Sequence, residues 1–209
     1  MEPVTNDRSG VRPLSFMSRL LRADGRSRGI DLFGSRRKAL DTAGVSAEAV
    51  HNFVRRHPEL RPVDVDLVKK GLLEWYRVIQ RVGTRAAVIP SSIVSDMWAE
   101  HAALSNEYAA FCKRCFGRIR RFLAPQVHVA GTVGDIAYRE LLRDTWKFAN
   151  KTHEGNGLPL IFGIDELLGV PDGRRYVEDC GTQVCSADRA FCLKHLPKRK
   201  YDDYDANRD

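Results

Sequence analysis

The apolar side chains of this chain recur at intervals of three and four positions, the spacing that places residues on one face of an α-helix. One such series runs from Val65 to Val82 and ends before Gly83. A longer series follows Pro90, and its seam consists of Val94, Trp98, His101, Ser105, Tyr108, Cys112, Cys115, Ile119 and Phe122. The sequence shows no run of alternating apolar and polar residues such as a strand would give. It therefore predicts a mainly α fold that contains two long helices, the second continuous from 90 to 122.

Three shorter helices are predicted beside the two long ones. The first begins after Ser46, a residue type that favours helix N-termini, and stops at His57. The second begins at Gly134 and ends before the loop at 153–157. The third covers 158–169 and is rich in apolar residues. All five helices lie in the middle of the chain, so we expect them to form a single helical domain.

The positive charge is concentrated near the N-terminus. The 209 residues carry a formal net charge of +7, and residues 1–38 hold nine Lys/Arg against four Asp/Glu. We therefore expect a basic, Arg/Gly-rich flexible arm over residues 1–40, followed by the helical domain at 41–196. A charged flexible tail is expected at 197–209, which lacks apolar anchors.

The sequence predicts a cytoplasmic protein with reduced cysteines. Its start, MEPVTND, carries two acids and no hydrophobic segment, unlike a secretory signal. The longest apolar stretch, 158–164, is far shorter than the roughly 20 residues that a membrane-spanning helix needs. The five cysteines are an odd number, and without an export signal we expect thiols rather than disulfides.

The most specific chemical feature is a set of cysteines and a histidine near the C-terminus. Cys180, Cys185, Cys192 and His195 lie within sixteen residues. Zinc prefers four tetrahedral sulfur or nitrogen donors, and a closed Cys3His set would form a structural site. The sequence thus predicts a C-terminal Cys/His-rich segment that binds a structural zinc ion. The alternatives are unpaired cysteines in a surface loop or, as a third choice, a disulfide such as Cys180–Cys185.

A second cysteine pair, Cys112 and Cys115, falls on the apolar seam of the long helix. Neighbouring cations could lower the pKa of these thiols and make them reactive. Their position on the seam favours the other interpretation, in which both side chains are packing residues.

A run of cations follows directly along the same helix. It consists of Lys113, Arg114, Arg118, Arg120 and Arg121, with no acid among them. Together with the basic arm, this run has the charge pattern of a nucleic-acid-binding protein. The chain shows no base-reading motif and no Gly-rich phosphate loop. A solvated helix face would account for the same cations.

A set of motif positions covers much of the chain and indicates a family. It comprises LLEWY at 72–76, LPLIFGIDELLGVPDGRRYVEDC at 158–180, and the residues Pro90, Ser91, Val94, Trp98, Tyr108, Phe111, Cys112, Phe116, Gly117, Arg118 and Pro125. In these positions the chain resembles an uncharacterised bacterial family related to the N-terminal region of glycine-rich domain-containing proteins. The resemblance covers roughly residues 58–195, and Ser105 stands where that family has Thr.

The histidines of that family are largely absent from this chain. Ala99 replaces the histidine after Trp, and basic and apolar residues at 120–122 replace a histidine pair. If those histidines bind a metal or transfer protons in the family, this chain lacks the corresponding ligands or proton-transfer groups. Asp96 and His101 could be remnants of such a site. Alternatively, His101 is a packed histidine that a neighbouring polar group satisfies.

Three functions remain open from the sequence. The first, which we favour, is a non-catalytic, zinc-stabilised helical interaction module that binds a macromolecular partner. The second is a nucleic-acid-binding protein that uses the basic arm and the cations at 113–121. The third is a metal-dependent enzyme centred on Asp96 and His101. The sequence favours a protein that is not an enzyme, because no complete catalytic set is visible, and it indicates no small-molecule cofactor.

Overall fold

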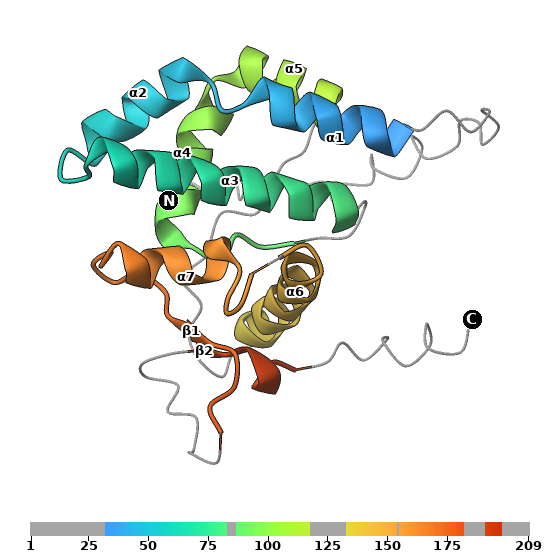
Figure 1. Cartoon of the computed structure of the whole chain (residues 1–209), viewed down its shortest axis with the longest axis vertical. Coiled ribbons are helices and arrows are strands. Elements are labelled where there is room, and N and C mark those ends of the chain that lie inside the picture. Colours follow the sequence, from blue (N-terminus) through green and yellow to red (C-terminus); the bar gives the residue numbers. More distant parts are fainter. Residues whose placement is uncertain (1–31, 83–86, 118–132, 154, 182–190, 198–209) are drawn as a thin grey trace, which may run out of the picture. The chain divides into compact units, whose positions relative to one another are not determined.

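The computed structural model describes residues 32–82, 87–117, 133–153, 155–181 and 191–197 (Figure 1). From Phe33 onward the chain forms one compact unit, which the following paragraphs describe. Within the described residues there are seven α-helices and two short strands, so the prediction of a mainly α fold is confirmed. The helices are α1 (Leu32–Ala43), α2 (Ala47–Arg56), α3 (Pro62–Val82), α4 (Ser92–Ala103), α5 (Ser105–Phe116), α6 (Val133–Asn150) and α7 (Leu160–Leu167). The strands are β1 (Tyr176–Val177) and β2 (Phe191–Cys192), and a 3-10 turn, η1 (Leu193–His195), follows β2.

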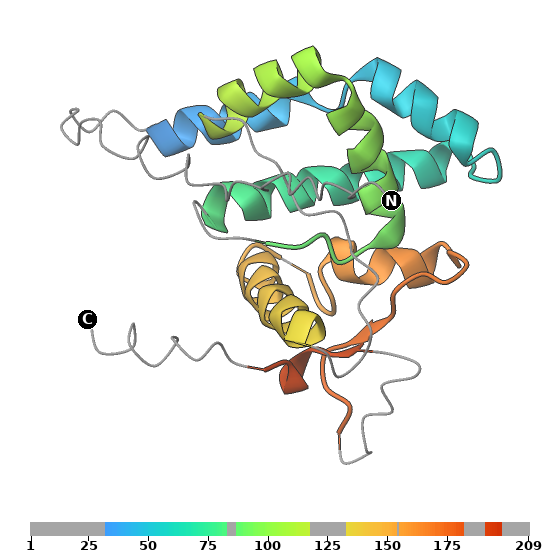
Figure 2. The same ribbon diagram turned by 180° about the vertical axis from the view of Figure 1, so that it is seen from behind.

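Helix α3 lies at the centre of the core. Helices α4, α6 and α7 all pack against it, while α1 and α5 lie on the side of α3 opposite to α6 and α7 (Figures 1 and 2). The buried residues of α3 include the whole series predicted from the periodicity: Val65, Val68, Leu72, Trp75, Tyr76, Ile79 and Val82. Because neighbours cover α3 on several sides, Gly71 and Val78 are buried as well.

The prediction of one continuous helix from 90 to 122 is wrong. Leu104 leaves the helical conformation, with φ −78° and ψ 67°, and its N–H bonds to the carbonyl oxygen of His101 at 3.3 Å. Helix α5 begins directly afterwards, and the indole N–H of Trp98 donates to the hydroxyl of Tyr108 across the bend (3.1 Å). Both helices keep their apolar seams, so the periodicity did not reveal the break. Helix α5 ends at Phe116, and residues 118–132 lie outside the described part of the chain.

The three shorter helices are confirmed as α2, α6 and α7. Helix α7 ends as expected before Gly169, whose φ of 61° is the left-handed conformation typical of a helix C-terminus. Helix α1 was not predicted and begins at Leu32, inside the segment 1–40 that was assigned to the flexible arm. Its residue Leu40 is fully buried. Residues 1–31 of the arm and 198–209 of the tail lie outside the described residues.

A buried carboxylate joins α4, α7 and the segment that leads into β1. Asp165 of α7 is 2 % exposed and accepts hydrogen bonds from the hydroxyl of Ser91 (2.5 Å) and the backbone N–H of Ser92 (2.8 Å). It also accepts from the backbone N–H of Arg174 at 2.9 Å. Ser91 in turn caps α4 by accepting from the N–H of Val94. One carboxylate therefore fixes the start of α4 and the path of the C-terminal segment.

Strand β1 is anchored to the helical core through side chains. The guanidinium of Arg174 donates to the carbonyl oxygen of Ile89 (3.3 Å) and to the hydroxyl of Tyr138 in α6. The buried Tyr176 hydroxyl donates to the carbonyl oxygen of Pro90 at 2.7 Å. The segment that carries the predicted cysteine and histidine ligands thus starts from a fixed position on the core.

No helix among the described residues is both long enough and apolar enough to span a membrane.

Candidate metal centre

Parallel pairing of β1 and β2 brings together two segments that lie far apart in sequence. Tyr176 is opposite Phe191 and Val177 is opposite Cys192. The N–H of Phe191 donates to the carbonyl oxygen of Arg175 at 2.8 Å. In a parallel pair the chains leave both strands at the same edge. The segment after β1, which contains Cys180, therefore runs beside η1, which contains His195.

Three of the four predicted zinc ligands meet at this edge. One ligand atom each from Cys180, Cys192 and His195 lies within 4.8 Å of the others, and the Sγ of Cys180 is 3.3 Å from the Nδ1 of His195. Tetrahedral zinc with Zn–S bonds of about 2.3 Å and Zn–N bonds of about 2.0 Å separates its donors by about 3.5–3.8 Å. If the two donor atoms that lie farthest apart moved about 1 Å closer together, the three donors would satisfy that geometry. The three side chains could therefore hold a metal ion. The fourth predicted ligand, Cys185, lies in 182–190, outside the described residues.

The three donors differ in their exposure. Cys192 is buried, Cys180 is half-buried, and His195 is exposed. Among the described cysteines, which are Cys112, Cys115, Cys180 and Cys192, the structure contains no disulfide. The group thus has a buried sulfur at its base and an accessible imidazole at its surface.

An ion pair aligns the two segments that carry the donors. The Nζ of Lys194 lies 2.6 Å from a carboxylate oxygen of Asp179, and the backbone N–H of Lys194 donates to the carbonyl oxygen of Glu178 (3.1 Å). The ammonium lowers the pKa of the Asp179 carboxyl. Both side chains are exposed, so the pair adds little stability by itself. Its effect is to hold Cys180 and His195, which are sequence neighbours of the pair, next to each other.

Asp96 and His101, the weak catalytic candidates, contact different partners. His101 is 2 % exposed, and its Nδ1 is 2.9 Å from the hydroxyl of Tyr76. Burial lowers the pKa of its imidazole to about 4, so His101 is neutral at pH 7. Asp96 is 44 % exposed and lies 3.3 Å from the Nε2 of His57. The partner and burial of His101 are those expected of a packed histidine.

A family model supplies the relationship of the chain to other proteins. The model described as UCP032817-like matches residues 35–196, from α1 to the end of η1. The chain belongs to the UCP032817-like family. The matched region includes Cys180, Cys192 and His195, so the candidate metal centre lies within the part of the chain that defines this membership. Searches of curated proteins and of solved structures gave no match to the chain.

The matched region also contains the second cysteine pair and part of the predicted cationic run. Cys112 and Cys115 are buried in α5, which confirms that they are packing residues, and burial raises the pKa of the Cys115 thiol. Lys113 and Arg114 are exposed in the last turn of α5. The other predicted cations of this run, Arg118, Arg120 and Arg121, lie outside the described residues.

Proposed function

We propose that the chain is a non-catalytic helical module that binds a macromolecular partner, and that a structural zinc ion stabilises its C-terminal segment. Cys180, Cys192 and His195 would supply three of the ligands, and Cys185 would supply the fourth. The observation that carries the proposal is the approach of the three donor atoms to within 4.8 Å of one another. A set of thiolates with one imidazole favours zinc over calcium or magnesium, which prefer oxygen ligands.

The local structure supports a stabilising role for the ion. Strands β1 and β2 pair over only two residues each, and such a short pair is marginal without other contacts. A metal that joins the segments after both strands would hold the pair closed, so part of its binding free energy would become folding free energy. Four protein ligands would leave no open position for a substrate, as is typical of structural zinc sites.

The environment of His101 supports a non-catalytic function. Its pKa of about 4 lies well below the range in which a histidine exchanges protons at neutral pH. Its imidazole contacts the aromatic rings of Tyr108 and Phe111, at centroid distances of 5.3 and 4.8 Å. These contacts and the hydrogen bond to Tyr76 place His101 in the core of the module.

We also propose that the chain is related to the N-terminal region of glycine-rich domain-containing proteins. The positions that carry this resemblance have structural tasks here: Ser91 caps α4, Trp98 hydrogen bonds to Tyr108, and Gly117 follows the end of α5. These structural roles support the proposal that the resemblance is one of fold. Thiolate ligands persist in a reducing compartment, and we accordingly propose a cytoplasmic location.

The test compares two buried cysteines, one in the metal centre and one in the helical core. We expect one zinc per wild-type chain by native mass spectrometry, no zinc in Cys192→Ala, and full zinc in the control Cys112→Ala. His195→Ala provides a second variant, because its exposed side chain can be truncated without opening the core. Zinc retained by both Cys192→Ala and His195→Ala would refute the proposed centre, as would a wild-type chain that binds no zinc.

A further inference from the structure

The side chain of Gln80 joins three helices at one place. Its amide nitrogen donates to the carbonyl oxygen of Arg36 in α1 (2.9 Å) and to that of Cys115 in α5 (3.0 Å). The guanidinium of Arg36 lies over Gly117, directly past the end of α5. The middle of α1 and the last turns of α3 and α5 therefore come together, on the side of α3 that faces away from α6 and α7 (Figures 1 and 2).

Each of these three segments carries cations, and we call the three segments together the three-helix end. It is defined by Arg36, Lys38, Arg81, Lys113 and Arg114, and all except the half-buried Arg36 are exposed. The last seven residues of α3 and of α5 contain no acid. Asp41, the acid of α1, is paired with Arg77 at 3.0 Å. Among the described residues, no carboxylate pairs with Lys38, Arg81, Lys113 or Arg114.

Helix dipoles account for only part of this arrangement. Cations in the last turn of a helix are stabilised by its negative end. This effect accounts for Arg81 at the end of α3 and, separately, for Arg114 at the end of α5. Lys38 lies in the middle of α1, where the dipole has little effect. The dipole also gives no reason for three segments that meet at Gln80 each to carry exposed or half-buried cations.

The chemistry of the three-helix end fits a phosphate backbone better than a membrane or a protein. Three of its five cations are arginines, whose planar guanidinium can hold two phosphate oxygens at once. Stable contacts with a membrane surface or a protein partner typically bury exposed apolar side chains as well. Among the described residues, the large exposed apolar side chains lie on other elements or, for Val63, in the first turn of α3 at its opposite end: Val54, Val63, Ile136, Leu167 and Val177.

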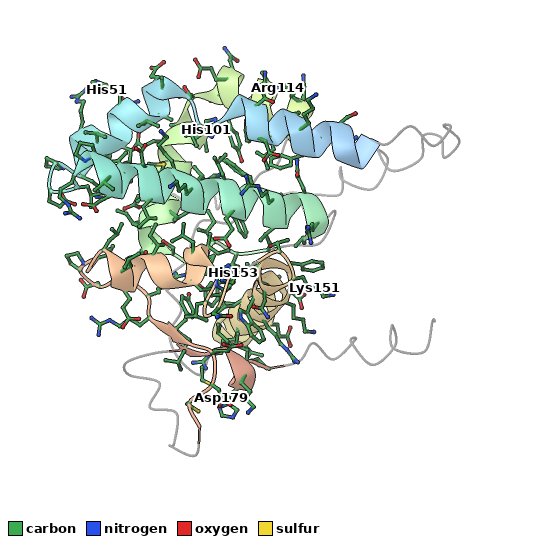
Figure 3. The ribbon with its side chains drawn as sticks, in the orientation of Figure 1. His51, His101, Arg114, Lys151, His153 and Asp179 are labelled. Atoms are coloured by element: carbon green, nitrogen blue, oxygen red, sulfur yellow. The ribbon has the colours of Figure 1, made fainter. Side chains whose placement is uncertain are left out.

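We propose that the three-helix end binds the phosphate backbone of a nucleic acid. This inference rests on the proposed function as an interaction module and names the class of its partner. The surface lies far from the candidate metal centre, as the positions of Arg114 and Asp179 in Figure 3 show. Binding at the three-helix end and zinc at Cys180, Cys192 and His195 can therefore be tested separately.

The experiment compares two double charge reversals in the full chain. Arg81→Glu with Arg114→Glu changes the three-helix end, whereas Arg55→Glu with Lys70→Glu changes exposed cations of α2 and the first half of α3. Both variants lower the net charge by four, and both change last-turn cations, Arg81 and Arg114 in the first variant and Arg55 in the second. Overall charge is therefore the same in the two variants, and only the position of the change differs.

Fluorescence anisotropy with a labelled 20-base-pair DNA duplex and a 20-nucleotide RNA measures the affinity at several salt concentrations. We expect Arg81→Glu/Arg114→Glu to weaken binding at least tenfold and Arg55→Glu/Lys70→Glu to stay within about twofold of wild type. The slope of log K against log salt should fall by about two for the first variant, since each phosphate contact contributes roughly 0.9. If a reversal perturbs folding, as judged by circular dichroism, the matching Gln substitutions replace Glu.

Several results would overturn the inference. Equal weakening by the two variants would show that overall charge, not the three-helix end, attracts the nucleic acid. Failure of wild type to bind either probe at low salt would exclude a nucleic-acid partner, and binding to phosphatidylserine vesicles in its place would assign the surface to a membrane. The zinc content of each sample separates this outcome from a failure of the proposed function. A chain that retains zinc without binding nucleic acid refutes only the partner.

Discussion

The imidazole Nδ1 of His195 lies 3.3 Å from the Sγ of Cys180, although the two residues are fifteen positions apart. The parallel pairing of β1 and β2 creates this approach, because the chain leaves both strands at the same edge. A cross-link that closes a loop of this length removes about 3 kcal/mol of chain entropy from the unfolded state. A metal ion at this point would therefore stabilise a segment whose strands pair over only two residues and whose Asp179–Lys194 ion pair is exposed.

The carboxylate of Asp165 should be among the most important polar groups for stability. It accepts hydrogen bonds from Ser91, Ser92 and Arg174 while nearly fully buried. Asp165→Ala would leave these donors without a buried acceptor, so we expect a loss of about 3 kcal/mol in the free energy of unfolding, measured with urea. The neighbouring exposed residue provides the control, since Glu166→Ala should change the free energy by less than about 0.5 kcal/mol. Similar effects of the two substitutions would contradict the role given to Asp165.

His101 should make the protein less stable in acid. Burial lowers the pKa of its imidazole from 6.5 to about 4, so the unfolded chain takes up a proton at a higher pH than the folded chain does. The favourable contribution of the neutral imidazole is thus complete above pH 6.5 and decreases as the pH falls towards 4. Between pH 7 and pH 4.5 the loss should be about 2.5 kcal/mol.

Urea denaturation of wild type and His101→Gln at both pH values isolates this effect, because the other titrating groups are shared. The variant should lose about 2.5 kcal/mol less than wild type over the same interval. Equal acid sensitivity of the two proteins would mean that His101 is already protonated or exposed in the folded state.

Two glycines should respond to alanine in opposite directions. Gly117 has a φ of 72°, and a Cβ there would meet the guanidinium of Arg36 at 2.5 Å, so Gly117→Ala should destabilise the protein by at least about 1 kcal/mol. Gly163 lies inside α7 with no atom within 4 Å of the position of a Cβ. Gly163→Ala should therefore stabilise the protein by about 0.5–1 kcal/mol. Thermal unfolding of both variants measures the difference, and the same sign for both would contradict the two local geometries.

The sequence predicted the helices well where one periodic face decides the structure. The seam of α3 was identified residue by residue, because every third or fourth position there packs on the core. The break at Leu104 was missed, because the series continues through Trp98 and Tyr108 on both sides of it. A hydrogen bond between those two side chains spans the bend, and the spacing of apolar residues does not encode such a contact.

The candidate metal centre was predicted from the residue types alone. Cys180, Cys192 and His195 are soft ligands at short spacing, and this was visible without a structure. The strand pairing that joins them was not visible, because strands of two residues have no alternating pattern. The three-helix end was also missed in part. Its cations lie in three distant segments, and contacts such as those of Gln80, which the sequence does not reveal, bring those segments together.

The most direct test of the central claim is the native mass and metal content of the purified full chain, before and after a strong chelator. We predict one zinc per chain and, on its removal, a lower melting temperature together with rapid proteolysis between Arg174 and Lys194. A chain that carries no metal, or one whose melting temperature and proteolysis are unchanged when the metal is removed, would contradict a structural zinc centre at Cys180, Cys192 and His195.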